Sequence, residues 1–431
     1  MSRQADLAHP RDEIMRVMER VYRYRMTTTS GGNISVREDD GTVWITPARV
    51  DKGSLTRGDI ARVGVDGTVE GPHRPSSELP FHRAIYAARP DVRAIVHAHP
   101  VALVAFSICR RVPDTRLLPT ARRVCGTVGF APYALPGSET LGKNIAGTFA
   151  SGFDCVVLEN HGVVTGGASL QEAFERFETL EFCAKTIIKA GLLGKVRYLS
   201  DADADRSRVA ATSSVLAPSG PISSDEKEQR RQLCEFVRRS YRQRMMISTQ
   251  GAFSARLADD DFLITPHRVD RSALDVQDLV RVCKGLPEPG GVPSTSAVNH
   301  RAIYQAHPRV GAVVTAYPVN ATAFSVTDVT LDPRTIPESY IFLRDVQRVP
   351  YGLQFGDGRE LAGQTSNRSP VVILENDGVQ VCGSNVLDAF DRLEVLESTA
   401  EAMINSRPLG AMVPMSSGAI EELTEAFLKD T

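Results

Sequence analysis

The sequence lacks the features that would place it in a disulfide-rich or membrane-spanning class. Its seven cysteines are odd in number and widely scattered, and no two form a Cys-x-x-Cys pair. Neither a disulfide framework nor a thiolate zinc site is therefore expected. No apolar run approaches the ~20 residues of a membrane helix, and the charged N-terminus does not resemble a signal peptide. We expect a reduced, cytoplasmic chain without a membrane anchor.

An excess of charge of one sign is also missing. The 50 basic and 52 acidic side chains leave a formal net charge of -2, so no global field attracts nucleic acid or an anionic membrane. We expect a small-molecule substrate that is recognised in a local pocket. Apolar residues make up 42% and charged residues 24% of the 431 positions, which is typical of a globular protein and, at this length, of two domains.

What the sequence does contain is a long internal repeat. Residues 22–37, YRYRMTTTSGGNISVR, align with residues 241–256, YRQRMMISTQGAFSAR, at an offset of 241 − 22 = 219. Farther along, VLENHGVV at 157–164 aligns with ILENDGVQ at 373–380, at an offset of 373 − 157 = 216. Two copies of one domain therefore account for nearly the whole chain.

The break between the copies falls in a stretch rich in Ser, Asp, Ala and Pro. We expect a first domain at 1–200, a linker at 201–222 and a second domain at 223–431. Helical and strand patterns alternate within each copy, which favours a mixed α/β fold. In the first copy the patterns predict helices at 11–25, 77–89, 139–150 and 169–191 and strands at 43–45, 60–63, 94–98, 156–158 and 163–164.

The segment IVHAHP at 95–100 carries candidate chemistry. Alternate residues of a strand point to one face, so His97 and His99 present both imidazoles to the same side. His161 follows an apolar strand in ENHG, where a turn that contains Gly can bring it toward the pair. Three imidazoles with coordination positions left over are typical of catalytic zinc and similar divalent ions. Taken alone, His-x-His also fits two hydrogen-bonded surface histidines.

The second copy favours the metal site over two surface histidines. Four positions that carry candidate chemistry all change there, while the framework residues around them persist. Such a joint loss is expected if the four residues form one site that one copy has given up. We predict one metal site, in the first copy, and a second copy that keeps the fold. The replacements are His97 by Thr315, His99 by Tyr317, His161 by Asp377 and Glu78 by Ser296.

Five stretches, SGGNIS, ITP, PSSE, HAHP and ENHG, resemble the class II aldolase and adducin head-domain family in order and spacing. Both copies show the resemblance, but only the first is complete. It implies two tandem α/β/α domains, each with a central, mainly antiparallel sheet flanked by helices. The family includes sugar-phosphate aldolases, an epimerase, a dehydratase, decarboxylases, an iron-dependent oxygenase and the non-enzymatic adducins.

The resemblance also assigns roles to residues of the first copy. Glu78 would be the acid/base residue next to the metal. Zinc is the expected ion, one per chain, with iron, manganese or cobalt as alternatives. The implied metal ligands are His97, His99 and His161, and the implied phosphate-binding positions are Asn33, Ser76 and Ser77. Thr46 is expected to bind substrate.

Elementary physical chemistry supports an anion near the serine pair. Ser76 and Ser77 begin a predicted helix, whose first N–H groups and dipole favour negative charge. The serines could equally be plain helix caps, and SGGNIS a plain turn. Arg49 stands where the sugar-phosphate aldolases usually have Gly. Its guanidinium would either grip a carboxylate or phosphate or block the usual phosphate position.

A second departure concerns a proton-donating Tyr that family aldolases bring from a neighbouring subunit. In the first copy that place is Leu118. The equivalent second-copy segment offers Tyr340 as a proton donor and Arg344 as a group that holds an anionic substrate end, with a solvated loop as the alternative. Family enzymes are commonly rings of four subunits. We therefore expect a homodimer whose four domains form a pseudo-fourfold ring.

The expected reaction is cleavage or formation of a carbon–carbon bond in a small hydroxy-keto substrate, phosphorylated or carboxylated, through a metal-stabilised enediolate. Glu78 would be the proton shuttle. Dehydration or epimerisation through the same metal chemistry and an iron-dependent oxygenase are alternatives. A non-enzymatic, adducin-like scaffold is a further alternative, although adducin-like heads lack the histidine set that this first copy has.

Overall fold

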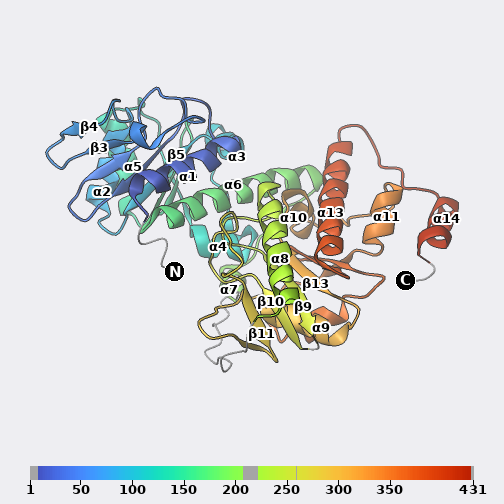
Figure 1. The fold of residues 1–431 in the computed structure, drawn as a ribbon. Helices are drawn as coiled ribbons and strands as arrows, with labels where there is room; N and C mark the ends of the chain where they lie inside the picture. The colour runs from blue at the N-terminus through green and yellow to red at the C-terminus, as the bar shows by residue number, and fades with distance from the viewer. Residues whose placement is uncertain (1–7, 207–221, 259, 429–431) are drawn as a thin grey trace. The chain divides into compact units, whose positions relative to one another are not determined.

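The computed structural model describes residues 8–206, 222–258 and 260–428. These residues form two compact units (Figure 1). The first unit runs up to Arg116 and from Ala121 to Lys185, and the second holds Leu117–Thr120 together with the described residues from Thr186 onward. None of the helices in the described part of the chain combines the length and the apolar character of a membrane span.

The first unit is built on an eight-stranded sheet with the order β4-β3-β2-β1-β5-β8-β7-β6. Neighbouring strands are antiparallel, except that β6 and β7 run parallel. The expected mainly antiparallel sheet is thus confirmed. Its strands are β1 (Asn33–Arg37), β2 (Val43–Ile45), β3 (Ala61–Val63), β4 (Val69–Glu70), β5 (Ala94–Ala98), β6 (Val128–Ala131), β7 (Cys155–Leu158) and β8 (Val163–Gly167).

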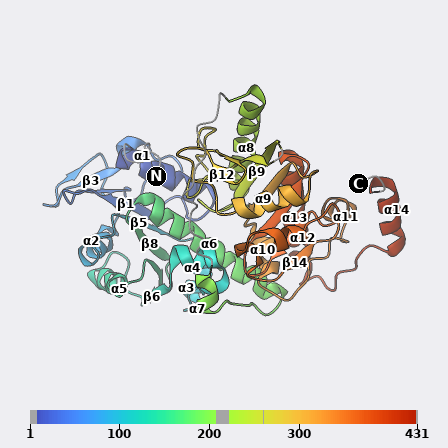
Figure 2. The same ribbon diagram turned by 90° about the horizontal axis from the view of Figure 1, so that it is seen from below.

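Helices cover both faces of this sheet. Because strand residues alternate between faces, Val96 of β5 packs with α1 and α6 in one core. Its neighbour Ile95 packs with α2 and α5 in the other core, and these two helices lie side by side (Figure 1 and Figure 2). The first-copy helices are α1 (Pro10–Arg23), α2 (Leu79–Ala88), α3 (Val101–Ile108), α4 (Pro119–Cys125), α5 (Glu139–Ala150) and α6 (Leu170–Leu193).

Several elements of the first copy were not predicted from the sequence, among them β1, β4, β6, α3 and α4. The stretch SGGNIS is not only a turn, because its Asn33 begins β1, a strand that pairs with β2 and β5. The helix α3 was not predicted. Its segment VALVAFSI is apolar all round and only eight residues long, so it shows no period that would distinguish helix from strand.

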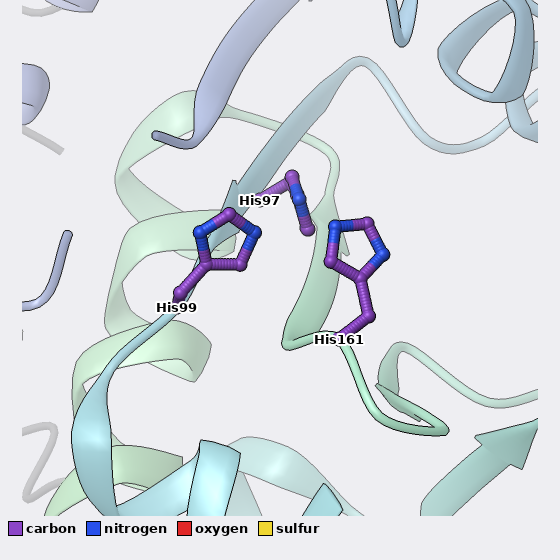
Figure 3. A group of neighbouring side chains, drawn as sticks. All are labelled: His97, His99 and His161. Carbon is purple, nitrogen blue, oxygen red and sulfur yellow. The ribbon is translucent and has the colours of Figure 1, made fainter. Parts of the chain in front are cut away.

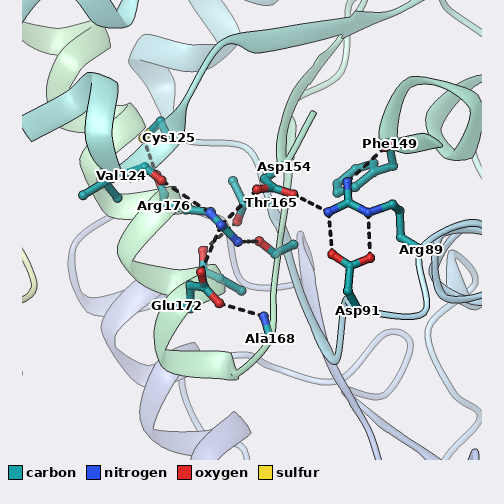
Figure 4. A network of polar contacts seen from close by, with 12 residues as sticks. Arg89, Asp91, Val124, Cys125, Phe149, Asp154, Thr165, Ala168, Glu172 and Arg176 are labelled. Carbon is teal, nitrogen blue, oxygen red and sulfur yellow. Dashed lines mark hydrogen bonds and ion pairs between the residues drawn. The ribbon is translucent and has the colours of Figure 1, made fainter. Parts of the chain in front are cut away.

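An ion-pair network joins the layers of the first unit (Figure 4). Asp154, just before β7, contacts Arg89 at the end of α2 at 3.0 Å and Arg176 of α6 at 2.9 Å. Arg89 also donates to the carbonyl oxygen of Phe149 in α5. One carboxylate therefore holds helices from both faces of the sheet to the start of a central strand.

The second copy repeats this architecture. Its sheet has the order β12-β11-β10-β9-β13-β16-β15-β14, again with one parallel pair, β14 and β15. The strands are β9 (Ala252–Ala258), β10 (Asp261–Ile264), β11 (Val280–Cys283), β12 (Leu286–Pro287), β13 (Ala312–Ala316), β14 (Gln347–Val349), β15 (Val371–Leu374) and β16 (Val379–Gly383). The helices are α8 (Ser224–Arg242), α9 (Ala297–Ala306), α10 (Val319–Ser325), α11 (Pro337–Leu343), α12 (Arg359–Gly363), α13 (Val386–Ser406) and α14 (Ser417–Phe427).

The expected linker at 201–222 is described only in part. A short helix, α7 (Asp201–Asp205), forms at its start, and α8 begins at Ser224 after its N-cap Ser223. The positions 207–221 lie outside the described residues. The domain boundaries at 200 and 223 stay predictions.

Candidate metal centre

Three imidazoles meet at the end of β5 in the first unit (Figure 3). His97 lies within β5, His99 follows the strand by one residue, and His161 lies in the turn between β7 and β8. One ring nitrogen from each histidine lies within 4.8 Å of the other two. Among the described residues, no other group of three or more His, Cys, Asp or Glu side chains is gathered in this way.

Strand pairing explains how His161 reaches the other two histidines. His97 pairs with Val164, and Ala98 with Val163, so the turn before β8 lies directly beside the end of β5. Gly162 makes this approach possible. A side chain there would put its Cβ 2.6 Å from the carbonyl oxygen of Ala98, a distance that would force the turn away from the strand.

The three histidines fit a divalent ion. The Nδ1 of His97 lies 3.0 Å from the carbonyl oxygen of Val163, which can only accept, so Nδ1 carries the proton and Nε2 keeps its lone pair. The Nε2 of His99 is buried without a hydrogen-bond partner, and that of His97 faces only the carboxylate of Glu78. Burial lowers the pKa of His99 to about 3 and that of His161 to about 4. Neutral imidazoles with lone pairs turned to one point are what a metal requires.

Glu78 stands at the N-cap of α2 and adjoins the cluster. Its Oε2 lies 3.1 Å from the Nε2 of His97, and its Oε1 lies 3.5 Å from the Nε2 of His161. Burial by itself would raise the pKa of this carboxyl group, but the histidines in their protonated form and the hydrogen bond from Asn33 hold the pKa below its usual value. Glu78 is therefore an ionised carboxylate in a nearly dry position.

A buried chain of hydrogen bonds fixes Asn33 and, through it, Glu78. The amide nitrogen of Asn33 donates to Glu78 Oε2 at 2.7 Å, and its amide oxygen lies 2.5 Å from His82 Nε2, which donates. The Nδ1 of His82 then accepts from Ser35, whose hydroxyl also contacts that of Tyr86. Sequence reasoning missed His82 as a site residue. The available signal was that HRAIY, which contains it, persists in both copies.

The structure brings together most of the residues expected to bind phosphate. Asn33 starts β1 beside His97, and the backbone N–H of Ser76 donates to the carbonyl oxygen of Thr46 at 3.1 Å. The hydroxyl of Ser76 accepts from the N–H of Glu78, the N-cap residue of α2, whose own side chain makes no capping hydrogen bond to this helix. The remaining two residues, Ser77 and Arg49, are exposed, the latter with a φ of 59°.

Tyr340 and Arg344, which were expected to donate a proton and to hold an anionic substrate end, belong to the second unit. Tyr340 lies on α11, and its hydroxyl lies 3.1 Å from that of Thr424 on α14. Arg344 follows α11 and donates to the carbonyl oxygen of Asn367 at 2.7 Å. Neither residue is part of the histidine cluster.

In the second copy, the positions that match the metal ligands make hydrogen bonds of their own. The hydroxyl of Thr315 lies 2.9 Å from the Nε2 of His300. The side-chain amide of Gln354 donates to Asp377 at 3.3 Å. At the three matching positions the second copy thus offers a hydroxyl, a carboxylate and a phenol ring in place of the three imidazoles.

A protein-family model described as Class II Aldolase and Adducin N-terminal domain matches residues 12–188 and again residues 231–404. The chain belongs to this family. The double match confirms a tandem duplication, and each copy keeps the strand order of the sheet. The first copy of this class II aldolase family member also keeps the histidine trio, whereas the second copy has lost it.

Several family relatives cover about the length of one copy. The 3-oxo-tetronate 4-phosphate decarboxylase of Pectobacterium atrosepticum is 34% identical over 200 residues, which are 45% of this chain and 89% of that protein. The L-fuculose phosphate aldolase of Methanococcus maripaludis is 32% identical over 177 residues, 40% of this chain and 93% of that protein. The crystal structure of YgbL from Escherichia coli is 30% identical, covers 46% of this chain and 97% of its own, and has a TM-score of 0.43.

Proposed function

We propose that the first copy is a metal-dependent lyase that cleaves or forms a carbon–carbon bond in a small, phosphorylated hydroxy-keto compound. The observation that carries this proposal is the convergence of His97, His99 and His161 on one point, with the Glu78 carboxylate 3.1 Å from the nearest ligand atom. Zinc is the expected ion, and iron, manganese or cobalt are alternatives with the same imidazole preference.

The residues around the cluster suit this chemistry. A divalent ion in the trio supplies Lewis-acid stabilisation to a substrate oxygen that gains negative charge. Asn33 holds the Glu78 carboxylate in one orientation, and burial keeps bulk water from it. Because Glu78 is ionised, it can accept a proton from a substrate hydroxyl as the carbon–carbon bond breaks, or return one to carbon.

Two bond cleavages are compatible with these groups. In aldol cleavage, Glu78 takes the proton of a hydroxyl, an aldehyde leaves, and the electron pair of the broken bond moves to the neighbouring carbonyl oxygen. In decarboxylation of a 3-oxo acid, carbon dioxide leaves and the pair moves to the same kind of oxygen. Decarboxylation is a second candidate because four relatives at 32 to 34% identity are named as decarboxylases of a 3-oxo acid phosphate.

A phosphate subsite at the start of α2 completes the proposal. The bond between Ser76 and Thr46 joins two segments next to the cluster, and the exposed Ser77 and Arg49 extend from these segments toward solvent. The helix N-terminus adds N–H groups and a favourable dipole. The side-chain amide of Asn33 donates a hydrogen bond to Glu78. We therefore assign Asn33 to positioning the carboxylate as well as to lining the phosphate subsite.

We also propose a homodimer whose four domains form a pseudo-fourfold ring, with Tyr340 and Arg344 reaching a first copy of the partner chain. Tyr340 would exchange its bond to Thr424 for one to substrate. A cytoplasmic location is proposed as well, since all seven cysteines carry free thiols, as reducing compartments favour.

The test uses the full chain with a phosphorylated ketose and a phosphorylated 3-oxo acid as probes. We expect metal-dependent cleavage of at least one probe, and a loss of about 10²- to 10⁴-fold in turnover for Glu78→Gln, because that variant removes one positioned proton-transfer group. Metal content, measured by elemental analysis, should stay unchanged.

Ser296→Ala is the matched control, since Ser296 occupies the position of Glu78 in the second copy, and its turnover should equal that of the unmodified chain. Cleavage that persists after complete metal removal, or that consumes oxygen, would contradict the proposal. So would full activity of Glu78→Gln.

A further inference from the structure

Lys52 of the first copy is a buried cation to which no role has been assigned so far. It has an exposed fraction of 3%, and its ammonium group donates to the carbonyl oxygen of Pro47 at 2.6 Å. An ammonium group has three donors, and among the described residues no carboxylate forms an ion pair with this one. Burial lowers the pKa of Lys52 to about 8. A buried charge without an ion-pair partner is costly.

This lysine lies between two segments that border the histidine site. Its backbone N–H donates to the carbonyl oxygen of Thr29 at 2.8 Å, whereas its side chain reaches Pro47. Pro47 forms an isolated β-bridge with Pro75, shortly before the start of α2. We call residues 29–32 the glycine loop. Lys52 therefore joins the glycine loop to the segment that leads to the start of α2.

A second buried polar group adjoins the glycine loop. The hydroxyl of Thr27 has no hydrogen-bond partner among the described residues, and Thr27 has an exposed fraction of 8%. Cβ atoms placed on Gly31 and Gly32 would stand 3.0 and 3.1 Å from this hydroxyl. The same Cβ on Gly31 would stand 3.1 Å from the Nδ1 of His99. Thr27 and the histidine cluster thus adjoin the same loop residue.

The second copy shows what a purely structural cation at this place looks like. Lys52 matches Arg271 (52 + 219), which is also buried. The guanidinium of Arg271 makes four hydrogen bonds, two to the carbonyl oxygen of Gly251 and one each to those of Pro266 and Val269. Gly251 is the match of the last residue of the glycine loop (32 + 219). The backbone of the second copy therefore engages this cation, and Lys52 makes only one such bond.

The match of Thr27 has also lost its polar group. Thr27 corresponds to Met246 (27 + 219), which is buried at 1%. A Cβ on Gly251 would stand 2.5 Å from the terminal methyl carbon of Met246, so the methionine packs below the loop. Only the copy that carries the histidine trio has a buried ammonium with one bond and a buried hydroxyl with none. A ligand that accepts hydrogen bonds from both groups would recover the free energy that their burial costs.

The chemistry of these two groups points to an anion. The positions that the family resemblance assigns to phosphate, Asn33, Ser76 and Ser77, carry no charge, whereas a phosphate monoester carries about −1.5 to −2 at pH 7. A lysine is a point charge that suits phosphate. We propose that Lys52 and Thr27 are specificity-determining residues that hold the phosphoryl group of the substrate through a buried positive charge and a hydroxyl donor. The inference rests on the proposed function and names the side chains by which the site selects a phosphorylated compound.

The first test measures binding of inorganic phosphate to the metal-loaded full chain by titration calorimetry. We expect Lys52→Met to raise the dissociation constant by roughly 10- to 100-fold and Thr27→Val by roughly 3- to 10-fold, as for lost hydrogen bonds to a charged group. Metal content should stay unchanged. The titration is repeated in the His97→Ala background, which removes the metal as an alternative ligand of phosphate. Unchanged dissociation constants in both variants would overturn the inference.

The second test separates phosphate binding from a structural brace. In urea unfolding without phosphate, Lys52→Met should keep or raise the midpoint, because it removes a buried charge that has no ion-pair partner. The matched variant Arg271→Met should lower the midpoint, because it leaves backbone carbonyls unpaired, and it should not change phosphate binding. Arg271→Lys takes its place if Arg271→Met does not fold. An equal fall of the midpoint in the variants of the two copies would mean that Lys52 is a brace.

A kinetic comparison distinguishes this inference from the lyase proposal. For the phosphorylated form of a ketose, Lys52→Met should raise KM by roughly 10- to 100-fold and leave kcat almost unchanged, because binding is lost equally in ground state and transition state. The KM for the unphosphorylated ketose should not change. Cleavage with an unaltered KM for the phosphorylated form would overturn the role of Lys52 and leave the lyase standing. Phosphate binding that depends on Lys52, in a chain that cleaves no probe, would support the role of Lys52 and overturn the lyase.

Discussion

His82 and its second-copy counterpart His300 show how a buried histidine can keep a structural role while the chemistry beside it disappears. Both bind a serine through Nδ1, Ser35 in one copy and Ser254 in the other. The partners at Nε2 differ. Where the first copy has Asn33, the second has Ala252, and Thr315 takes over the bond to His300. Because a buried polar group needs a partner, Thr315 supplies in the second copy the hydrogen bond that Asn33 supplies in the first.

The burial of His300 predicts a pH-dependent stability. Burial lowers its pKa to about 3, against about 6.5 in an unfolded chain. Protonation therefore favours the unfolded state, and the stabilisation by neutral His300 is complete above pH 6.5 and is lost as the pH falls toward 3. We expect His300→Gln to flatten the fall of the unfolding free energy between pH 6.5 and 4. Urea unfolding of the unmodified chain and of His300→Gln across this range measures the unfolding free energy. Identical slopes of that free energy against pH would contradict the assignment.

The sequence could predict the ligand trio but not the support of Glu78. That His97 and His99 share a face follows from strand alternation, and the loss of both in the second copy pointed to a joint role. The bond from Asn33 to Glu78 depends on the register of β1 against β5, in which Asn33 lies opposite His97. No local pattern encodes that pairing, and SGGNIS alone fits a turn as well as a strand.

Among the elements, β7 is preceded by Asp154, whose side chain contacts helices on both faces of the sheet of the first unit. Asp154 contacts Arg89 and Arg176, which come from helices on opposite faces of the sheet. Asp154→Asn keeps the size but removes the charge. We expect a loss of about 1–3 kcal/mol in unfolding free energy, since hydrogen bonds to charged groups are stronger than neutral ones.

Asp39→Asn is the control for this element. Asp39 also pairs with an arginine, Arg93, but its side chain is 94% exposed, and exposed ion pairs contribute about 0–1 kcal/mol. Chemical unfolding of the two variants compares them directly. Equal stability of Asp154→Asn and Asp39→Asn would mean that the network of Asp154 is no more than a surface pair.

Among the helices of the first copy, those with long periodic patterns could be predicted from the sequence, and short ones could not. The helix α5 has the predicted bounds at 139–150, and β5 those at 94–98. The helices α3 and α4 were missed because seven or eight residues show too few turns for a period to appear. In the second copy α12 has five residues where α5 has 12, although the repeat itself suggested equal helices.

For the whole molecule, the repeat in the sequence was enough to predict two copies of one domain and which copy gathers three histidines. It did not predict that Leu117–Thr120 would pack with the second copy. That segment carries no signal of its own. Its packing is visible only in the coordinates, where Leu118 is buried and Ile336, at the matching position of the second copy, is exposed.

The whole chain should bind one divalent ion. Within the part of the chain that the structure describes, three imidazole nitrogens come together in the first copy alone. In the second copy, Thr315 is hydrogen-bonded to His300 and Asp377 to Gln354, and a hydroxyl with one carboxylate is a poor substitute for three imidazoles. Elemental analysis of the purified full chain should therefore give one ion per chain.

Two variants separate the copies in this measurement. His97→Ala should abolish both the bound ion and turnover, because two imidazoles leave an ion with too few protein ligands. Asp377→Ala, at the second-copy position of His161, should keep the full metal content. Two ions per chain, or loss of the ion in Asp377→Ala, would mean that the second copy takes part in metal binding. One ion per chain would instead fix two ions in the proposed dimer, one in each domain that retains the histidines, with domains that lack them in between.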